Sequence, residues 1–271
     1  MKRLILNADD FGIAPEVNQA VEIAHRDGVL RAASLIVNAQ ATEDAVERAR
    51  RTPSLAVGLQ VALVHGRPVL PQERVPDLVD EQGEFLVDLV RAGVRFFFRP
   101  RVRAQLAAEI RAQFKRFAQT GLRLDHADAQ SHMHVHPTIF ALILRIGREF
   151  GLRAVRLPRE PFGGTRSIEF WLALMRARAR RVGVVTNDWA FGVNEAGALD
   201  EARLMEILDR LPEGVTEVFF HPATGPFAAA DYGTERYQWA AELAALTSSR
   251  VRAEIERDGI ELVTYGELAH R

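Results

Sequence analysis

Two groups of polar residues have the types and spacing that hydrolytic chemistry needs. The segment LDHADAQSHMHVHP, residues 124–137, holds four of the chain's eight histidines within eleven positions, with Gln130 among them. The stretch LILNADD, residues 4–10, ends on the adjacent acids Asp9 and Asp10. Carboxylates and imidazoles bind cations and transfer protons near neutral pH. The two groups together indicate a hydrolytic, metal-capable site, although each alone has a structural explanation.

The adjacent aspartates need different tasks if both serve one site. Neighbouring residues on a strand point to opposite faces, which argues against the facing carboxylate pair of a glycosidase. At the end of a strand the chain bends, so both could reach one pocket, one to bind a cation and the other to take a proton. The alternative is that Asp9-Asp10-Phe11-Gly12 is a turn that caps the next helix.

His132, His134 and His136 recur at every second position. In an extended segment they would share one face and form a metal-binding or proton-transfer surface. Three histidines at this spacing cannot all bind one ion without strain. For any one of them, a hydrogen-bonded structural role is the alternative.

Two further polar residues stand at strand ends, where a structural strand would have apolar residues or a turn. They are Gln60 in VGLQVAL and His221 in VFFHP. In a barrel of parallel strands, the C-terminal ends of the strands meet at one face. We therefore expect these two residues to converge with the aspartates and the histidine-rich segment.

Short β-rich runs alternate along the chain with longer stretches of helical periodicity, about seven times. The β-rich runs are RLILNADD, AASLIVNA, AVGLQVAL, LRLDHADA, AVRLPRE, VVTNDWAF, VTEVFFHPA and IELVTYGEL, and one long helix is expected from Arg236 to Asp258. Strands joined by helices must run parallel. The pattern predicts an α/β fold, a distorted (β/α) barrel of about seven parallel strands, in a single domain over residues 1–271. A doubly wound open sheet is the alternative, but no glycine-rich phosphate loop follows the first strand.

Residues 64–101 interrupt this alternation and are too many for a βα loop. Insertions of this size are usually lids or binding loops. Phe96 to Phe98 would be core residues, or an apolar wall or oligomer contact over a site. His65 is expected to be an exposed loop residue. Arg176, Arg178, Arg180 and Arg181 fall in an expected helix, where a solvated face is the first interpretation and a membrane-facing patch the second.

The composition is that of a globular protein, with 48% hydrophobic residues and a net charge of −1 over 271 residues. The near-neutral balance gives no reason to expect nucleic acid as a partner. The chain has no cysteine, which excludes disulfides and thiolate metal ligands. The N-terminus has a run of only three apolar residues before Asn7, and no run approaches the roughly 18 apolar residues of a transmembrane helix. We therefore expect a cytoplasmic protein.

Several motifs, taken in order, resemble the YdjC-like, or chitooligosaccharide deacetylase, family. They are LILNADDFGIAPEVNQAV, VGLQVALVHGRPVLP, LDHADAQSHMHVHP, VRLPRE and VFFHPAT. The resemblance covers nearly the whole chain and is specific because ADDFG, the histidine-rich segment and HPA occur together. Three features look most like the subgroup associated with hopanoid biosynthesis, termed HpnK: LVHGRPVLP, the LDH lead-in to the histidines, and the stretch DWAFGVNEAGALDEARLMEILDRLPEGVTEVFFHPAT. The resemblance implies removal of an N-acetyl group from an amino sugar, which could be part of a hopanoid glycolipid.

Carried over residue by residue, the resemblance makes Asp9 the general base and Asp10 a metal ligand. His221 would be the proton donor or a transition-state contact, and Arg156 would orient the base. Contacts with substrate are expected from three more residues: Phe11, His132 and His134.

The other two metal ligands of the family are histidines, and here Gln60 and Gln130 stand in their places. Glutamine reaches about as far as histidine, but its amide oxygen is a neutral, hard ligand, whereas imidazole suits zinc. The resemblance implies a divalent ion, zinc or magnesium, and the affinity for zinc should be much weaker here. Three outcomes stay open: a harder ion, a site rebuilt with His65 or His132, and a site without metal.

The leading hypothesis is a metal-dependent carbohydrate N-deacetylase. Asp9 would deprotonate a water polarised by a cation on Asp10, and His221 would protonate the departing amine. A glycolipid substrate would add contact with the inner membrane surface, and a homodimer is a further expectation. A second hypothesis is a sugar-binding homologue that has lost its metal site and its turnover. A lyase or aldolase would need a lysine at a strand end, and Lys2 and Lys115 are poorly placed for that.

Overall fold

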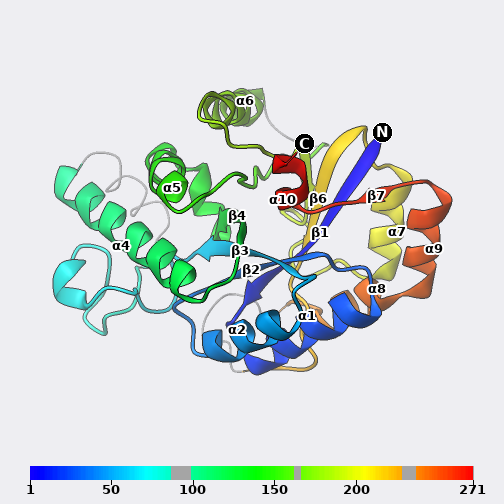
Figure 1. The fold of residues 1–271 in the computed structure, drawn as a ribbon, viewed down its shortest axis with the longest axis horizontal. Helices are drawn as coiled ribbons and strands as arrows, with labels where there is room; N and C mark the ends of the chain where they lie inside the picture. Colours follow the sequence, from blue (N-terminus) through cyan, green and yellow to red (C-terminus); the bar gives the residue numbers. More distant parts are fainter. Residues whose placement is uncertain (87–98, 162–165, 228–235, 271) are drawn as a thin grey trace.

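The computed structural model describes residues 1–86, 99–161, 166–227 and 236–270, in which helices surround a curled parallel sheet (Figure 1). Seven strands form this sheet in the order β4-β3-β2-β1-β6-β5, with β7 pairing to β1. All the strand pairs are parallel. The strands are β1 (Lys2–Phe11), β2 (Ala32–Leu35), β3 (Ala56–Val61), β4 (Leu124–Ala129), β5 (Trp189–Phe191), β6 (Gly214–Phe220) and β7 (Glu261–Leu262).

Single bridges carry the sheet around from β4 towards β5 and β6. Ala127 pairs with Val155, and Ala154 pairs with Val185. The Asp188 N–H then donates to the carbonyl of Val215 in β6 at 2.8 Å. The predicted barrel-like fold of about seven parallel strands is confirmed, and an open doubly wound sheet is not what forms. The run AVRLPRE contributes two bridging residues rather than a full strand, which is where the barrel is distorted.

The helices follow the predicted alternation closely. They are α1 (Pro15–Asp27), α2 (Thr42–Arg51), α4 (Pro100–Gln119), α5 (Pro137–Glu149), α6 (Arg166–Arg181), α7 (Glu201–Asp209), α8 (Trp239–Thr247), α9 (Ser249–Arg257) and α10 (Tyr265–Ala269). The single helix expected from Arg236 to Asp258 is wrong. Ser248 has extended backbone angles and its hydroxyl accepts from the N–H groups of Arg250 and Val251, so it ends α8 and caps α9.

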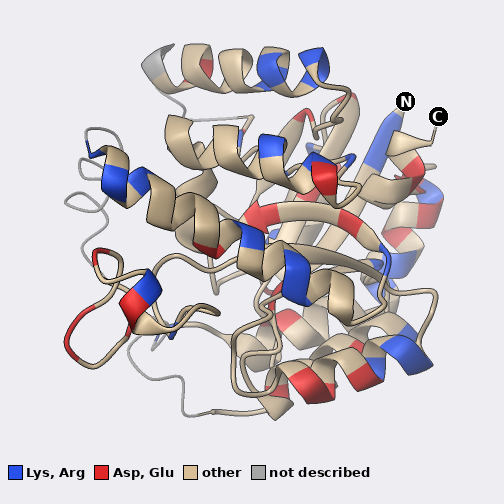
Figure 2. Cartoon of the chain, turned by 60° about the vertical axis from the view of Figure 1, so that its left-hand side comes forward, with Lys and Arg blue, Asp and Glu red and all other residues tan. Residues whose placement is uncertain are grey.

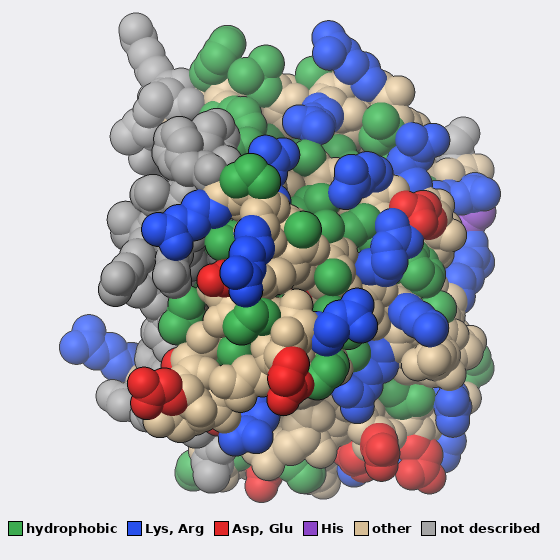
Figure 3. Space-filling model, turned by 90° about the vertical axis from the view of Figure 1, so that its left-hand side faces the viewer, with side chains coloured by type: hydrophobic (Ala, Val, Ile, Leu, Met, Phe, Trp, Pro, Cys, Tyr) green, Lys and Arg blue, Asp and Glu red, His purple; other side chains and the backbone are tan. Residues whose placement is uncertain are grey.

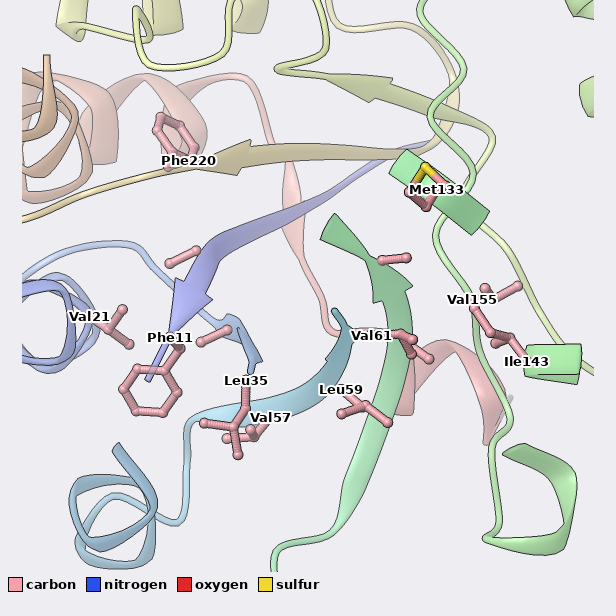
Figure 4. Close-up of a cluster of buried hydrophobic side chains, with 14 of the residues drawn as sticks. Phe11, Val21, Leu35, Val57, Leu59, Val61, Met133, Ile143, Val155 and Phe220 are labelled. Atoms are coloured by element: carbon pink, nitrogen blue, oxygen red, sulfur yellow. The ribbon is translucent and has the colours of Figure 1, made fainter. Parts of the chain in front are cut away.

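The strands alternate between two environments, and this alternation positions the site. In β1, Leu4, Leu6 and Ala8 belong to the main hydrophobic core between sheet and helices. Asn7 and Asp9 alternate with these residues along the strand, so their side chains point to the opposite face and are buried inside the barrel. Figure 4 shows the outer core, where Leu35, Val57 and Leu59 from β2 and β3 gather beside Phe11.

The insertion packs against α4 as far as it is described. The Glu109 carboxylate of α4 accepts from the N–H groups of Val69 and Leu70 at 2.9 and 3.0 Å. Gln105 accepts from the Asp77 N–H at 2.9 Å. A 3-10 turn, η1 (Gln72–Arg74), lies within the insertion. Phe96 to Phe98 lie outside the described residues, and α4 already begins at Pro100.

Among the helices of the described residues, none combines the length and the apolar character needed to cross a bilayer.

Candidate active site

A cavity of about 190 Å³ opens at the C-terminal ends of the strands, where the barrel predicts a site. It brings together residues from β1, β3, β4 and β6, the turn after β4, and three loops. Its lining residues include Asp9, Asp10, Gln60, His65, Gln130, His132, Phe219, His221 and Tyr237. The predicted convergence of the aspartates, Gln60, the histidine-rich segment and His221 is therefore present in the structure.

Asp9 is held by a two-pronged ion pair with Arg156. The guanidinium donates to both Asp9 carboxylate oxygens at 2.7 Å. Asn7 adds a third hydrogen bond at 2.8 Å to Asp9 Oδ1. Such bidentate, charge-assisted bonds fix the carboxylate in one orientation. Because Oδ2 receives only one of these bonds, it retains acceptor capacity for a water in the cavity.

Arg156 is fully buried and does not line the cavity, so it acts on Asp9 rather than on a ligand. It also donates to both oxygens of Glu217, at 2.9 and 2.8 Å. Glu217 in turn accepts from the Tyr265 hydroxyl at 2.6 Å. Burial opposes the charge on Arg156, but Asp128, Asp9 and Glu217 hold the pKa of its guanidinium well above the ordinary value. The arginine is a permanent cation at the centre of the barrel.

A second buried chain of polar groups leads to Asp128. Ser34 donates to Asp128 Oδ2 at 2.5 Å, and His126 Nε2 lies 3.5 Å from the same oxygen. His126 Nδ1 bonds Asp125 at 2.9 Å. Burial alone would lower the pKa of His126, but its bonds to Asp125 and Asp128 raise it to about 9. Burial would raise the pKa of Asp128, but Arg156 and then His126 hold it well below its usual range. Both groups are therefore charged at neutral pH.

Asp10 reaches the cavity because the backbone turns there. Its φ of 60° lies in the left-handed region, which non-glycine residues seldom adopt. The Gln60 amide oxygen accepts the Asp10 N–H at 2.8 Å and supports this conformation. Burial, then the charges of Asp9 and Asp128, raises the pKa of Asp10 to about 7. Asp10 can therefore exchange a proton near neutral pH.

The predicted metal ligands do not fit a zinc-type ion. Gln60 uses its amide oxygen to hold the backbone of Asp10, while Gln130 Oε1 is buried without a hydrogen-bond partner. The predicted set thus combines one carboxylate with two neutral amides. In the described part of the chain, no three His, Cys, Asp or Glu side chains are grouped so as to hold an ion. The dependence on a divalent ion stays a prediction.

The histidine-rich segment is a turn, so the single face that an extended segment would give its histidines does not form. Residues Gln130–Val135 form the 3-10 turn η2, in which Ser131 and His132 have φ angles of 50° and 53°. The turn separates the three histidines. His132 lines the cavity, with its ring 5.2 Å from that of Phe219, and burial lowers its pKa to about 4.

The other two histidines have different surroundings. His134 is fully buried outside the cavity lining, and burial, then the charge of His132, lowers its pKa to about 3. His136 Nδ1 accepts from the Thr138 N–H at 3.2 Å and caps α5. The expected contact of His132 with substrate suits its position, whereas His134 can act only from behind the cavity wall.

His221 lies across the cavity on the end of β6. Its backbone N–H donates to Glu242, and its ring lies 4.9 Å from that of Tyr237. Burial lowers the pKa of His221 below its ordinary value, so the imidazole is neutral at pH 7. A neutral imidazole carries one N–H and one acceptor nitrogen. This favours a hydrogen-bonding contact over a standing proton donor.

Two residues lie elsewhere than expected. Phe11 is fully buried in the hydrophobic core beside Leu35 (Figure 4), so the expected contact with substrate is wrong. Regular alternation would put Phe11 on the same face as Asp9, but the strand register shifts between Ala8 and Phe11, where Asp10 has a φ of 60°, and this turns the ring towards the core. His65, expected to be exposed, is half-buried and borders the cavity.

Several residues of the site were not assigned from the sequence. A signal was present for those on strands, since each is a polar residue within a short β-rich run. They are Asn7, Ser34, His126 and Glu217. Tyr237 had no such signal, because it belongs to an irregular segment that reaches the cavity only in the folded chain.

A larger hollow, of about 830 Å³, lies at the opposite ends of the strands. Its arginines are already engaged: Arg31 lies 3.4 Å from Glu267, and Arg50 donates to the Thr120 carbonyl at 2.7 Å. The described residues that border it include none of the predicted site residues. The smaller cavity is therefore the candidate active site.

Fold and site together define a (β/α) barrel protein with an acid–base pocket at the C-terminal face. Residues 3–257 match the family described as YdjC-like protein, and the chain belongs to this family. It is 32% identical over 269 residues to a carbohydrate deacetylase of Brevibacillus brevis, covering 98% of this chain and 99% of that protein. It is 31% identical to a human carbohydrate deacetylase, covering 98% and 91%.

One similar solved structure supports the fold over the same length. It is the crystal structure of a protein from Enterococcus faecalis that is described in terms of cellobiose-phosphate cleavage. The TM-score is 0.81 and the sequence identity is 29%. The match covers 98% of both chains. The family, the fold and the position of the cavity are thus consistent with one another.

Proposed function

We propose that the protein is a carbohydrate deacetylase that hydrolyses the acetamide of an N-acetylated amino sugar. The observation that carries the proposal is the Asp9–Arg156 pair, which aims an oriented carboxylate into a cavity that His132 and His221 also border. Relatives that cover nearly the whole chain and carry the name carbohydrate deacetylase support the reaction class.

The chemistry requires a water, a base and groups that stabilise a developing oxyanion. Asp9 takes a proton from the water as the water oxygen bonds to the acetamide carbon. The carbonyl oxygen becomes negative, and the N–H of neutral His221 can donate to it. The C–N bond then breaks as the proton on Asp9 passes to the amine nitrogen. The acyl group leaves as acetic acid, which becomes acetate when its proton passes to the solvent or to the free amine. Arg156 positions Asp9 throughout, because both of its oxygens are tied to the guanidinium.

Two finer features belong to the same proposal. The sugar could be carried on a lipid such as a hopanoid, as the sequence resemblance implies. A divalent ion could assist, although the residues present do not suit zinc, and no step above depends on it. Comparing a soluble N-acetylated oligosaccharide with a lipid-linked amino sugar, each with and without added Mg²⁺ or Zn²⁺, separates these features.

Acetate release from N-acetylated glucosamine oligosaccharides tests the reaction directly. Asp9→Asn should lower the rate about 10²-fold or more, because general base catalysis contributes on this scale. Asp27→Asn, at an exposed aspartate of α1, should leave it unchanged. Binding of the sugar by the unmodified protein without any acetate release would refute the deacetylase and support the binding homologue.

A further inference from the structure

The outward face of α6 is apolar in its first half and basic in its second. Phe170 is 68% exposed, Leu174 46% and Ile168 45%. With Met1, they are the exposed large hydrophobic residues of the described chain. Arg178 and Arg181 follow Leu174 at helical spacing and are exposed too. Exposed apolar side chains next to arginines are typical of helices that lie in the interface of a membrane.

Positive charge is concentrated in one part of the chain. Residues 99–181 contain 17 Lys and Arg against 6 Asp and Glu, a net charge of +11 in a chain whose total is −1. Figure 2 shows Lys and Arg along α4, α5 and α6, which lie one above another. On the face in Figure 3, basic and hydrophobic side chains are interspersed and acidic ones are few.

Most of this positive charge is not neutralised by nearby acids. The exposed side chains of the three helices include ten basic residues and one acid, Glu149, which is paired with Arg111. The basic residues are Arg101, Arg103, Arg111, Lys115, Arg116, Arg145, Arg148, Arg178, Arg180 and Arg181. Of these, Arg101 also has an acidic partner, Asp77 of the insertion, at 3.1 Å. A surface of this kind attracts polyanions.

We propose that α6 and the basic face of α4 and α5 dock on the surface of an anionic lipid bilayer. The apolar residues favour a bilayer over a nucleic acid as the anionic partner. Phe170, Leu174 and Ile168 would be removed from water at the acyl boundary of a bilayer, whereas a phosphate backbone offers them no apolar contact. The arginines supply attraction to anionic headgroups. No membrane-crossing helix is needed for this contact.

The docking surface is connected to the cavity. The Trp171 indole N–H of α6 donates to the Val135 carbonyl at 2.9 Å. Val135 ends η2, the turn that presents His132 to the cavity. A bilayer bound through α6 would therefore lie next to the elements that form the site. This link rests on the proposed function and suits an amino sugar that is exposed on a lipid, but the docking itself does not depend on turnover.

Co-sedimentation of the full chain with vesicles tests the docking without any activity measurement. Vesicles with phosphatidylglycerol should retain the protein at low salt and release it as salt rises, whereas pure phosphatidylcholine vesicles should not. Phe170→Ser with Leu174→Ser, and separately Arg178→Gln with Arg180→Gln and Arg181→Gln, should each lower the partition coefficient roughly tenfold or more. Far-UV circular dichroism and the Tm of each variant check that it is folded.

A matched control removes three exposed arginines from α9, which lies on another side of the molecule (Figure 1): Arg250, Arg252 and Arg257. Their replacement by Gln should leave vesicle binding nearly unchanged. Equal losses for both arginine sets would overturn the assignment of the surface. So would binding to duplex DNA in place of vesicles, or a dimer in solution that dissociates when Phe170 is replaced. Acetate release from a soluble oligosaccharide should be unaffected by the α6 variants.

Discussion

Replacement of Arg156 by Met would remove the cation that joins three buried carboxylates. Asp9 and Glu217 each lose two charge-assisted hydrogen bonds of 2.7 to 2.9 Å, and Asp128 loses an ion pair at 3.6 Å. Methionine fills much of the volume, but it leaves Asp9 and Glu217 without a cationic partner, while Asp128 keeps only His126 at 3.5 Å. Breaking a buried ion pair in this way costs about 3–5 kcal/mol. We expect a loss of this size in the free energy of unfolding at pH 8.

The loss of stability caused by Arg156→Met should be smaller in acid. In the variant, like charges and burial raise the pKa values of Asp9 and Glu217 in the folded state above their unfolded values. The folded variant then binds more protons than the unfolded chain, so its stability rises as the pH falls. In the unmodified protein, the low pKa of Asp128 gives stability that is lost only in stronger acid. Between pH 8 and pH 5, the difference in unfolding free energy between the two proteins should therefore decrease. The decrease is about 1.4 kcal/mol per pH unit for each extra proton that the folded variant binds.

Urea unfolding followed by circular dichroism at pH 5 and pH 8 measures both effects. Arg153→Met, at an exposed arginine three residues away, should change the free energy by no more than about 0.5 kcal/mol. Arg156→Lys keeps one charge and should give an intermediate loss if the Met variant does not fold at pH 8. A loss below about 1 kcal/mol for Arg156→Met, or one that is equal at the two pH values, would refute the account of this network.

Three other measurements test separate parts of the structure. The folded-state pKa of His126, about 9, exceeds its unfolded value, so the stability that its charge contributes should be complete below about pH 6.5 and lost as the pH rises through about 9. Unfolding free energies measured across this range should show the decline, and the decline should be absent in His126→Gln. A Cβ at Gly58 would lie 2.4 Å from the His126 ring, so Gly58→Ala should cost about 1–3 kcal/mol, whereas Gly225→Ala, with open space, should cost little. Replacing Gln60 and Gln130 together by His should raise bound zinc, measured by elemental analysis, towards one per chain; unchanged zinc would show that these positions do not face a common ion.

The order of strands and helices, and the residues at the strand ends, could be read from the sequence. Alternating β-rich and helical runs require parallel strands, and parallel strands place their C-terminal ends together. That is why Asp9, Gln60 and His221 could be expected at one cavity although they are far apart in the chain. The same alternation marks Asn7 and Glu217 as interior residues, because every second side chain of a strand faces the barrel.

Only the tertiary structure decided which polar side chains of the site contact one another. The backbone turn at Asp10 and the left-handed turn at Ser131 and His132 could not be read from the sequence, so the face that a period of two would give to His132, His134 and His136 does not form. The pKa shifts follow from burial and from neighbours that fold into contact, as for His221 and Asp128. The sequence supplies the charged groups, and folding sets the distances between them that give each group its protonation state.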